Sequence, residues 1–405
     1  MNCKIGCAGV LSACVMTGVL SPMAATAGDE IFVGYGMTGE KNVSAESVVT
    51  QEDAVTVEAN ADLRKTGTGT WVVPSAKFAH NADATISVRE GVVEVPEGGS
   101  VPAVADASDV LARAALHVVA DPAKGLVLDE SANGVTEWRD VRDVAGEVRT
   151  RRYFLPTWDS SRSGTALYNK NPAYVEDAYG SKAVYFGGWN SSQAMKLTET
   201  DGTAVSLEGV RHLFIVHSVS NSYGCTVQGA NGLLTISDVY NGSKTEKIFA
   251  AYKQTFVNGA FTDSFANPPL LGKQLFDVRI PSEDGYTVDV NRLFCDRDIP
   301  GRFGGDYLHE IVLFTEALTA EECSKVARAL MERHSLSCTR PQTAFVTANK
   351  GAVSIPVEAD AIRKVGETLS VAGYGTVVKS GTGTLEIEEP RTPFEGALRM
   401  DSGAA

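Results

Sequence analysis

The chain is short of basic charge and of long hydrophobic runs. Its 405 residues carry 36 Lys and Arg against 50 Asp and Glu, a formal net charge of −14 at pH 7. Such an acidic balance disfavours nucleic acid and anionic membrane surfaces as partners. After Ala27, no apolar run approaches the ~20 residues of a membrane-spanning helix. We therefore expect no membrane span in the mature chain.

Common catalytic motifs are also missing. The sequence contains no G-x-S-x-G nucleophile turn, no H-E-x-x-H zinc motif and no Walker loop. His309 and Glu310 lie next to each other on an expected strand, without a second histidine nearby in the sequence. We interpret them as a surface pair rather than as part of a zinc site. The sequence predicts a protein that is not an enzyme.

The segment from Met1 to Ala27 has the features of an export signal. Lys4 gives a positive start, Ile5–Leu20 is mostly apolar, and a small-x-small pattern ends at Ala27. We predict cleavage after Ala27 and a secreted or cell-surface location. A lipoprotein anchored at Cys14 is the alternative, but the apolar residues continue well past this cysteine.

Four cysteines remain after the signal segment: Cys225, Cys295, Cys323 and Cys338. In an exported chain they permit two disulfides in any of three pairings, among which the sequence does not choose. No C-x-x-C pair is left, so a zinc or redox site has little support. Cys323 falls on the apolar face of an expected helix, where simple burial is the alternative to a disulfide.

The clearest local signal is a strand followed by one helix. Tyr307–Phe314 is apolar and β-branched apart from its His-Glu pair, which predicts a strand covered on both faces. Thr319 and Glu322 have the spacing of a capping box, and Leu318 with Cys323 that of a hydrophobic staple. The apolar residues that follow share one helical face. We therefore expect a β-domain closed by one helix.

A Gly-Thr-rich motif occurs twice, near the two ends of the chain. Residues 65–70 (KTGTGT) correspond to residues 379–384 (KSGTGT), and each copy leads into a β-like run. The motif resembles the autotransporter-associated β-strand repeat, K-x-G-x-G-T-L-x-L followed by G-x-L-x-V-x-x-G, which implies coils of a right-handed parallel β-helix in an exported protein. Two separated copies are too few for a stable solenoid. The flanks are therefore expected to be small β-units, or the ends of something longer.

Between the flanks, short strands at regular spacing and one late helix predict a two-sheet sandwich. This block resembles the LamG-like jelly roll of the concanavalin A-like lectin/glucanase superfamily. Five segments carry the likeness: GLVLD at 125–129, NGVTEWRD at 133–140, KAVYFGG at 182–188, LFIV at 213–216, and GDYLHEIVLF with ALTAEE between 305 and 322. The resemblance implies two antiparallel sheets, with ligands at one edge or on the concave face. The E-x-D-x-x-E strand of its glycosidase relatives is absent.

Candidate binding residues lie in the loops. Trp158 and Trp189 occur in Gly/Ser/Asn-rich stretches and are candidate carbohydrate platforms, with packing over a sheet edge as the alternative. Trp138 is expected to point into the core. Three aspartates near glycines are weak Ca²⁺ candidates, with a solvated acidic loop as the alternative: Asp296, Asp298 and Asp306. No other cofactor is expected.

Together these patterns predict an all-β chain. We expect a signal peptide at 1–27, a β-repeat segment at 28–105, an antiparallel two-sheet jelly-roll sandwich with one late helix at 106–337, and a second small β-repeat, solenoid-like segment at 338–405. The expected function is adhesion or glycan binding at the cell surface or outside the cell, with a glycan or an extracellular protein as the ligand. The alternatives are a purely structural scaffold and a carbohydrate-active enzyme. Ligand identity and the mode of anchoring stay open.

Overall fold

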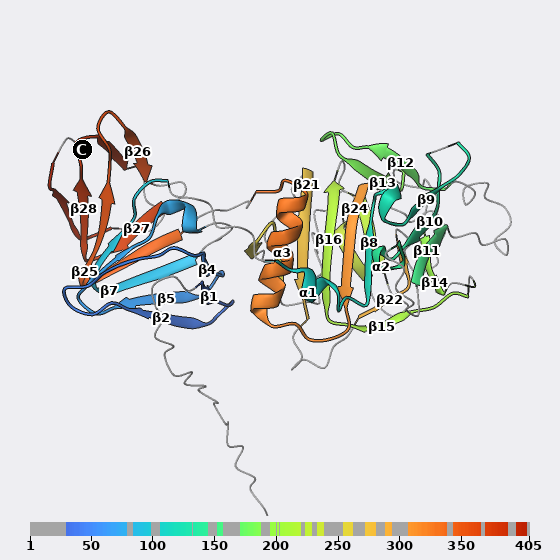
Figure 1. Cartoon of the computed structure of the whole chain (residues 1–405), viewed down its shortest axis with the longest axis horizontal. Coiled ribbons are helices and arrows are strands. Elements are labelled where there is room, and N and C mark those ends of the chain that lie inside the picture. Colours follow the sequence, from blue (N-terminus) through green and yellow to red (C-terminus); the bar gives the residue numbers. More distant parts are fainter. Residues whose placement is uncertain are drawn as a thin grey trace, which may run out of the picture.

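The structure is a computed structural model of a chain built almost entirely from strands (Figure 1). It describes residues 30–78, 84–98, 106–131, 133–144, 152–156, 171–187, 195–199, 201, 203–219, 223–228, 233–238, 254–261, 272–280, 288–293, 307–337, 343–365, 369–387 and 394–402. Two bodies are visible: a bundle of strands from both ends of the chain, and a domain formed by the residues between them.

Both ends of the chain build one parallel β-solenoid. Thr38 pairs with Asp62, and Asp62 in turn pairs with Thr85. The chain therefore returns to the same face of the solenoid once in every coil. The N-terminal elements are β1 (Ile31–Val33), β2 (Thr38–Asn42), β3 (Val48–Thr50), β4 (Val55–Val57), β5 (Asp62–Thr66), β6 (Thr70–Val72), the 3-10 helix η1 (Ser75–Phe78) and β7 (Ala84–Glu94). The C-terminal strands are β25 (Thr343–Pro356), β26 (Ile362–Val365), β27 (Leu369–Gly373), β28 (Thr376–Ser380), β29 (Thr384–Ile387) and β30 (Ala397–Met400).

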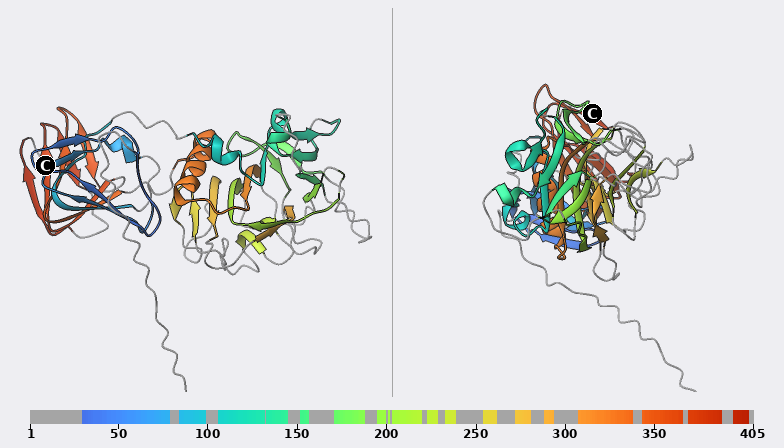
Figure 2. Two further views of the ribbon diagram at one scale, coloured as in Figure 1. Left: turned by 60° about the horizontal axis from the view of Figure 1, so that its bottom comes forward. Right: turned by 90° about the vertical axis from the view of Figure 1, so that its right-hand side faces the viewer.

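The two halves of the solenoid join through β7 and β25. These strands pair in parallel from Ala84↔Thr343 to Glu94↔Ser354. The blue and red strands therefore lie side by side in one body, although the whole middle of the chain separates them in sequence (Figures 1 and 2). One hydrophobic core runs through both halves and includes Trp71, Ile86 and Phe345.

The chain is all-β, as expected, but the expected antiparallel jelly-roll sandwich flanked by small, solenoid-like β-repeat segments is wrong. The chain contains a parallel β-solenoid, and the two flanks are halves of that solenoid rather than separate units. Short strands at regular spacing with turns between them occur in solenoids as well as in sandwiches, so spacing alone does not give strand direction. Counting repeat copies also misleads, because coils without a recognisable motif complete the stack.

The residues between β7 and β25 form an inserted domain whose strand pairs are antiparallel. One sheet has the order β18-β17-β23-β14-β11-β10-β9, and the other the order β12-β13-β24-β16-β21-β19-β20, with β8 paired to β24. Strands β15 and β22 form a separate pair. The strands of the domain are β8 (Leu116–Val119), β9 (Leu126–Leu128), β10 (Val135–Arg139), β11 (Arg152–Pro156), β12 (Ala173–Glu176), β13 (Lys182–Tyr185), β14 (Met195–Glu199), β15 (Leu207–Val210), β16 (His212–Val219), β17 (Tyr223–Gln228), β18 (Leu233–Asp238), β19 (Gln254–Val257), β20 (Ala260–Phe261), β21 (Gly272–Arg279), β22 (Val288–Val290), β23 (Arg292–Leu293) and β24 (Tyr307–Phe314).

Helical elements accompany these strands: the short α1 (Ser108–Leu111), the 3-10 helix η2 (Pro122–Lys124), the short α2 (Val141–Val144) and the longer helix α3 (Ala320–Arg333). Trp138 is fully buried in the core of the inserted domain, as expected, and its indole N–H donates to the carbonyl of Val119 at 2.7 Å.

Helix α3 confirms the local prediction. Thr319 and Glu322 form the capping box, and the predicted apolar face is buried against the outer side of β16, β21 and β24. Cys323 is a free, buried cysteine, so it takes part in none of the anticipated disulfides. The helix lies on the side of the inserted domain that faces the solenoid (Figure 1). No helix in the described part of the chain is long and apolar enough to cross a membrane.

Candidate functional site

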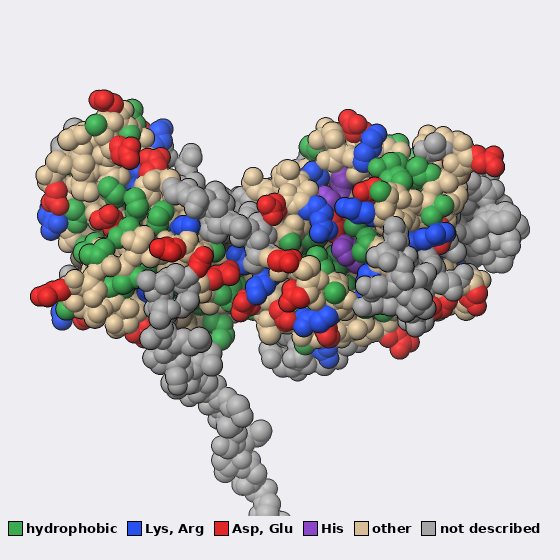
Figure 3. All heavy atoms as spheres, in the orientation of Figure 1, with side chains coloured by type: hydrophobic (Ala, Val, Ile, Leu, Met, Phe, Trp, Pro, Cys, Tyr) green, Lys and Arg blue, Asp and Glu red, His purple; other side chains and the backbone are tan. Residues whose placement is uncertain are grey.

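A carboxylate on β24 is the centre of a buried polar cluster. Glu310 is fully buried, yet three basic side chains reach it: His117 from β8, and Arg333 and His334 from the end of α3. His117 Nε2 lies 2.6 Å from Oε1, and His334 Nε2 lies 2.7 Å from Oε2. Figure 3 shows histidine and Lys/Arg side chains together on this face of the inserted domain.

The protonation of this cluster follows from its hydrogen bonds. Burial raises the pKa of Glu310, but hydrogen bonds from His117 and His334 and the charge of Arg333 outweigh it and lower the pKa to about 2. An ionised carboxylate can only accept hydrogen bonds, so each histidine presents an N–H at Nε2. Arg333 and His334 lie at the C-terminal end of α3. The free carbonyl groups at this end carry a negative partial charge, which favours positively charged side chains.

A second group lies beside the first, around His309. The Ser218 hydroxyl has one hydrogen, for which Asp177 Oδ2 at 2.6 Å and His309 Nε2 at 2.7 Å compete. His309 Nδ1 donates to the carbonyl of Lys182 at 3.0 Å, and its ring is 5.9 Å from that of His334. Burial lowers the pKa of His309 to about 4, so the ring is neutral near pH 7.

The second group has the residue types of a serine-hydrolase triad but not its geometry. In a triad the acid holds Nδ1 of the histidine while the serine faces Nε2. Here Asp177 lies 3.1 Å from Nε2, the nitrogen that also contacts Ser218, and Nδ1 is held by a backbone carbonyl. The serine side chain is also fully buried. The group ties the turn after β12 to β16 and β24 rather than activating a nucleophile.

The interpretation of His309 and Glu310 as a surface pair is wrong. Their exposed fractions are 2% and 0%. Both lie at an irregularity in the β16–β24 register, between Val216↔Glu310 and His217↔Leu308, which allows two consecutive residues to face polar partners. In the described part of the chain, no group of three or more His, Cys, Asp or Glu side chains is placed to hold a metal ion.

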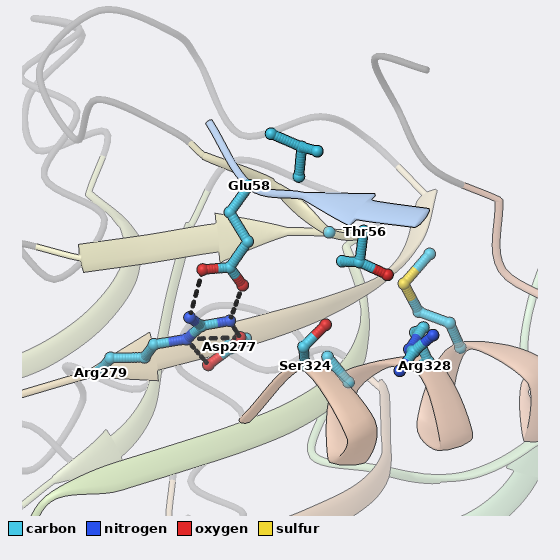
Figure 4. Close-up of a pocket in the computed structure, with 10 residues that line it drawn as sticks. Thr56, Glu58, Asp277, Arg279, Ser324 and Arg328 are labelled. Atoms are coloured by element: carbon cyan, nitrogen blue, oxygen red, sulfur yellow. Dashed lines mark hydrogen bonds and ion pairs between the residues drawn. The ribbon is translucent and has the colours of Figure 1, made fainter. Parts of the chain in front are cut away.

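A third polar group joins the solenoid to the inserted domain (Figure 4). Arg279 on β21 makes a two-pronged bond to Glu58, which directly follows β4 in the second coil, at 2.9 and 3.0 Å, and also binds Asp277 at 2.7 Å. All three side chains are buried. Burial raises the pKa of Asp277 to about 6, although Arg279 opposes this shift.

Other contacts support this junction. Arg328 on α3 binds Glu30 at 2.8 Å, and the ring of Tyr35 packs on Phe261 with ring centres 4.7 Å apart. A small cavity lies between the two bodies, next to α3. Two buried polar atoms on its lining, Thr56 Oγ1 and Arg328 Nε, have no hydrogen-bond partner among the described residues.

We expect Glu58→Gln to loosen the junction. The change leaves Arg279 with one carboxylate instead of two in a buried site, and breaking such a pair costs about 3–5 kcal/mol. Calorimetry should then show two heat-absorption peaks in place of one, because the solenoid and the inserted domain no longer unfold together. Glu52→Gln, at an exposed position of the connection between β3 and β4, is the control and should leave the trace unchanged. A single unshifted peak for Glu58→Gln would mean that the ion pair does not couple the two bodies.

The repeated Gly-Thr motif has a structural role that the sequence did not specify. Lys65 is buried, and its ammonium group donates to the carbonyls of Gly67, Gly69 and Glu90, at 2.5, 2.8 and 2.9 Å. Lys379 in the second copy binds the carbonyls of Gly381 and Ser402 in the same way. The lysine of each motif thus fastens its own turn to the next coil.

The binding residues expected from the sequence stay predictions. Trp158, Trp189, Asp296, Asp298 and Asp306 all lie outside the described residues. Sequence reasoning also missed the Glu310 cluster and the Arg279 junction. The one available signal for the cluster is a His-Glu pair inside an apolar strand, followed by Arg333 and His334 at the end of the next helix.

Comparison with protein-family models, with curated proteins and with solved structures gave no match.

Proposed function

We propose that the chain is an exported, non-enzymatic protein of the cell surface or extracellular space, in which the solenoid presents the inserted domain to a glycan or protein ligand. The export signal predicted at residues 1–27 and the acidic composition of the chain support the location. The pairing of β7 with β25 is the observation that carries the presenting role. It joins the coils that precede the inserted domain to the coils that follow it, so the domain projects from one continuous solenoid.

The junction supports a fixed presentation. Both chain connections to the inserted domain leave from neighbouring strands of the solenoid, and the Glu58–Arg279 pair adds a buried contact between the two bodies. A domain held at several points keeps one orientation, so its far surface stays turned away from the solenoid (Figure 2). The loop tryptophans Trp158 and Trp189 belong to this inserted domain and remain the candidate ligand contacts.

Two measurements test the proposal on the full chain. Expression in a bacterial host followed by N-terminal sequencing of the exported protein should give a mature chain that begins at Gly28. The exported protein should then bind immobilised glycans or extracellular matrix proteins. Trp189→Ala or Trp158→Ala should weaken this binding at least tenfold; Trp138 is a core residue and is not substituted. Retention of the full-length chain in the cytoplasm contradicts the location, and equal binding by wild type and both variants contradicts the ligand site.

A purely structural role is the second candidate. The polar groups described above are mostly ion-paired or hydrogen-bonded to one another, which is typical of groups that stabilise a fold. This candidate predicts that the exported protein retains no ligand on any array, while keeping a single cooperative unfolding transition.

A further inference from the structure

One ladder of parallel strands runs through the solenoid from its first coil to its last. It consists of β3, β6, β7, β25, β28 and β30, paired in this order. The rungs of the ladder at one side-chain position are, from first to last, Val49, Trp71, Val93, Val353, Val377 and Leu398. The two ends of the solenoid are therefore the two ends of a single repeating pattern.

Burial along this ladder changes abruptly at its end. The four middle rungs are at most 4% exposed, whereas Leu398 is 47% exposed. On the same strand, Met400 is 45% exposed, and at the other end of the ladder the first rung, Val49, is only partly buried. Among the described residues, β3 pairs only with β6, and β30 only with β28. Each end thus combines an unpaired strand edge with apolar side chains, the combination that promotes strand addition.

The stack does not depend on chain continuity. At its centre, β7 and β25 pair in parallel although the entire inserted domain lies between them in sequence. Coils from separate segments therefore already join in this molecule through backbone pairing and shared apolar rungs. A second molecule can supply the next coil by the same contacts.

We infer that the open end at β30 binds the open end at β3 of a second copy of this chain. A copy moved along the solenoid axis keeps the parallel strand direction and places its Val49 on Leu398, which continues the row of apolar rungs. The edges match in length, with three residues in β3 and four in β30. Because the contact joins two different surfaces, it does not close on itself, and copies associate head to tail.

The test uses the mature chain and two end-blocking variants, Val49→Lys and Leu398→Lys. The average mass of the wild type in light scattering should rise with concentration beyond twofold. Each variant alone should stay monomeric, because every contact needs both kinds of end. An equimolar mixture of the two variants should form a dimer and nothing larger, since each variant retains the end that the other has lost.

Two controls separate this interface from other causes. Tyr179→Lys, at an exposed position on the inserted domain, should associate like the wild type. Thermal unfolding of both end variants should remain cooperative, and dimer formation in the mixture itself requires that both are folded. The proposal is overturned if the wild type stays monomeric at all concentrations, if either end variant still associates alone, or if the mixture does not dimerise.

Discussion

Glu310→Gln should lower the free energy of unfolding by about 3–5 kcal/mol, the usual effect of breaking a buried ion pair. The glutamine keeps the shape of the side chain but removes the charge that Arg333, His117 and His334 share. A guanidinium and two imidazole N–H groups then compete for one neutral acceptor. Denaturant unfolding of the two proteins at pH 7 measures the difference.

The same residue predicts how stability depends on pH. The pKa of Glu310 in the folded protein is lowered to about 2, from an ordinary value of 4.5. The folded state therefore holds this proton less tightly than the unfolded state, so the carboxylate stabilises the protein fully above pH 4.5. This contribution, of the order of 3 kcal/mol, is lost as the pH falls from 4.5 towards 2.

Comparing the two proteins across this range isolates the carboxylate. His117, His309 and His334 also face the cluster, but they are present in both proteins. The gap in stability between wild type and Glu310→Gln should therefore narrow as the pH falls through the window. A gap that stays constant from pH 7 to pH 3 would falsify the assignment of the acid sensitivity to Glu310.

A surface carboxylate gives the matched control. Glu316 binds Arg113 at 2.9 Å, but both side chains are nearly half exposed. Exposed pairs of this kind contribute about 0–1 kcal/mol, so Glu316→Gln should change stability by no more than that. An equal loss for the two variants would mean that burial of Glu310 adds nothing to its ion pairs.

The sequence is most informative where the interactions are local. The capping box at Thr319 and Glu322, the covered strand Tyr307–Phe314 and the apolar face of α3 all depend on residues close to each other in the chain, and the structure confirms them. Cap geometry and amphipathic periodicity are properties of short segments, so they can be deduced without a fold.

Interactions between distant segments could not be deduced in this way. His117 and Glu310 are 193 positions apart, and Glu58 and Arg279 are 221 apart. Nothing local to either residue names its partner, and the His-Glu pair therefore resembles a surface feature. The prediction of the fold class failed for a related reason. The complete stack of coils decides whether a strand pairs with a neighbour in sequence or with a strand on the other side of an inserted domain.

The lysine motif shows the limit of a correct local observation. The two copies resemble units of a parallel β-helix, but their separation in the sequence leaves open whether they are small β-units or the ends of something longer. In the structure, the insertion between them interrupts the chain and not the sheet, because β7 and β25 stack as consecutive coils. Sequence separation is thus a poor guide to the number of coils in a solenoid that carries an insertion.

Gly67→Ala should be among the most damaging single substitutions in the solenoid. A Cβ at this position lies 2.2 Å from the carbonyl oxygen of Val43 in the neighbouring coil, and the backbone φ is +74°. A backbone oxygen cannot move aside as a flexible side chain can, so the coils must separate. Separation also disturbs the carbonyl of Gly67, which accepts from Lys65.

Gly36→Ala is the control that separates strain from collision. Gly36 has nearly the same φ of +71°, but its Cβ meets nothing within 4 Å. It should cost only the strain of a positive φ, about 1 kcal/mol. Gly67→Ala should cost this strain and about 1–3 kcal/mol or more for the collision. The difference between the two variants in denaturant unfolding therefore measures how closely the coils stack.

The position of the damage gives a second readout. The Val43–Gly67 contact joins the first two coils, so amide hydrogen exchange should accelerate in β2, β3 and β5 more than in the inserted domain. Gly381→Ala should act in the same way in the C-terminal coils, since its Cβ lies 2.1 Å from the carbonyl oxygen of Val357. Equal stability of the Gly36 and Gly67 variants, with unchanged exchange in these strands, would contradict the close stacking on which the solenoid depends.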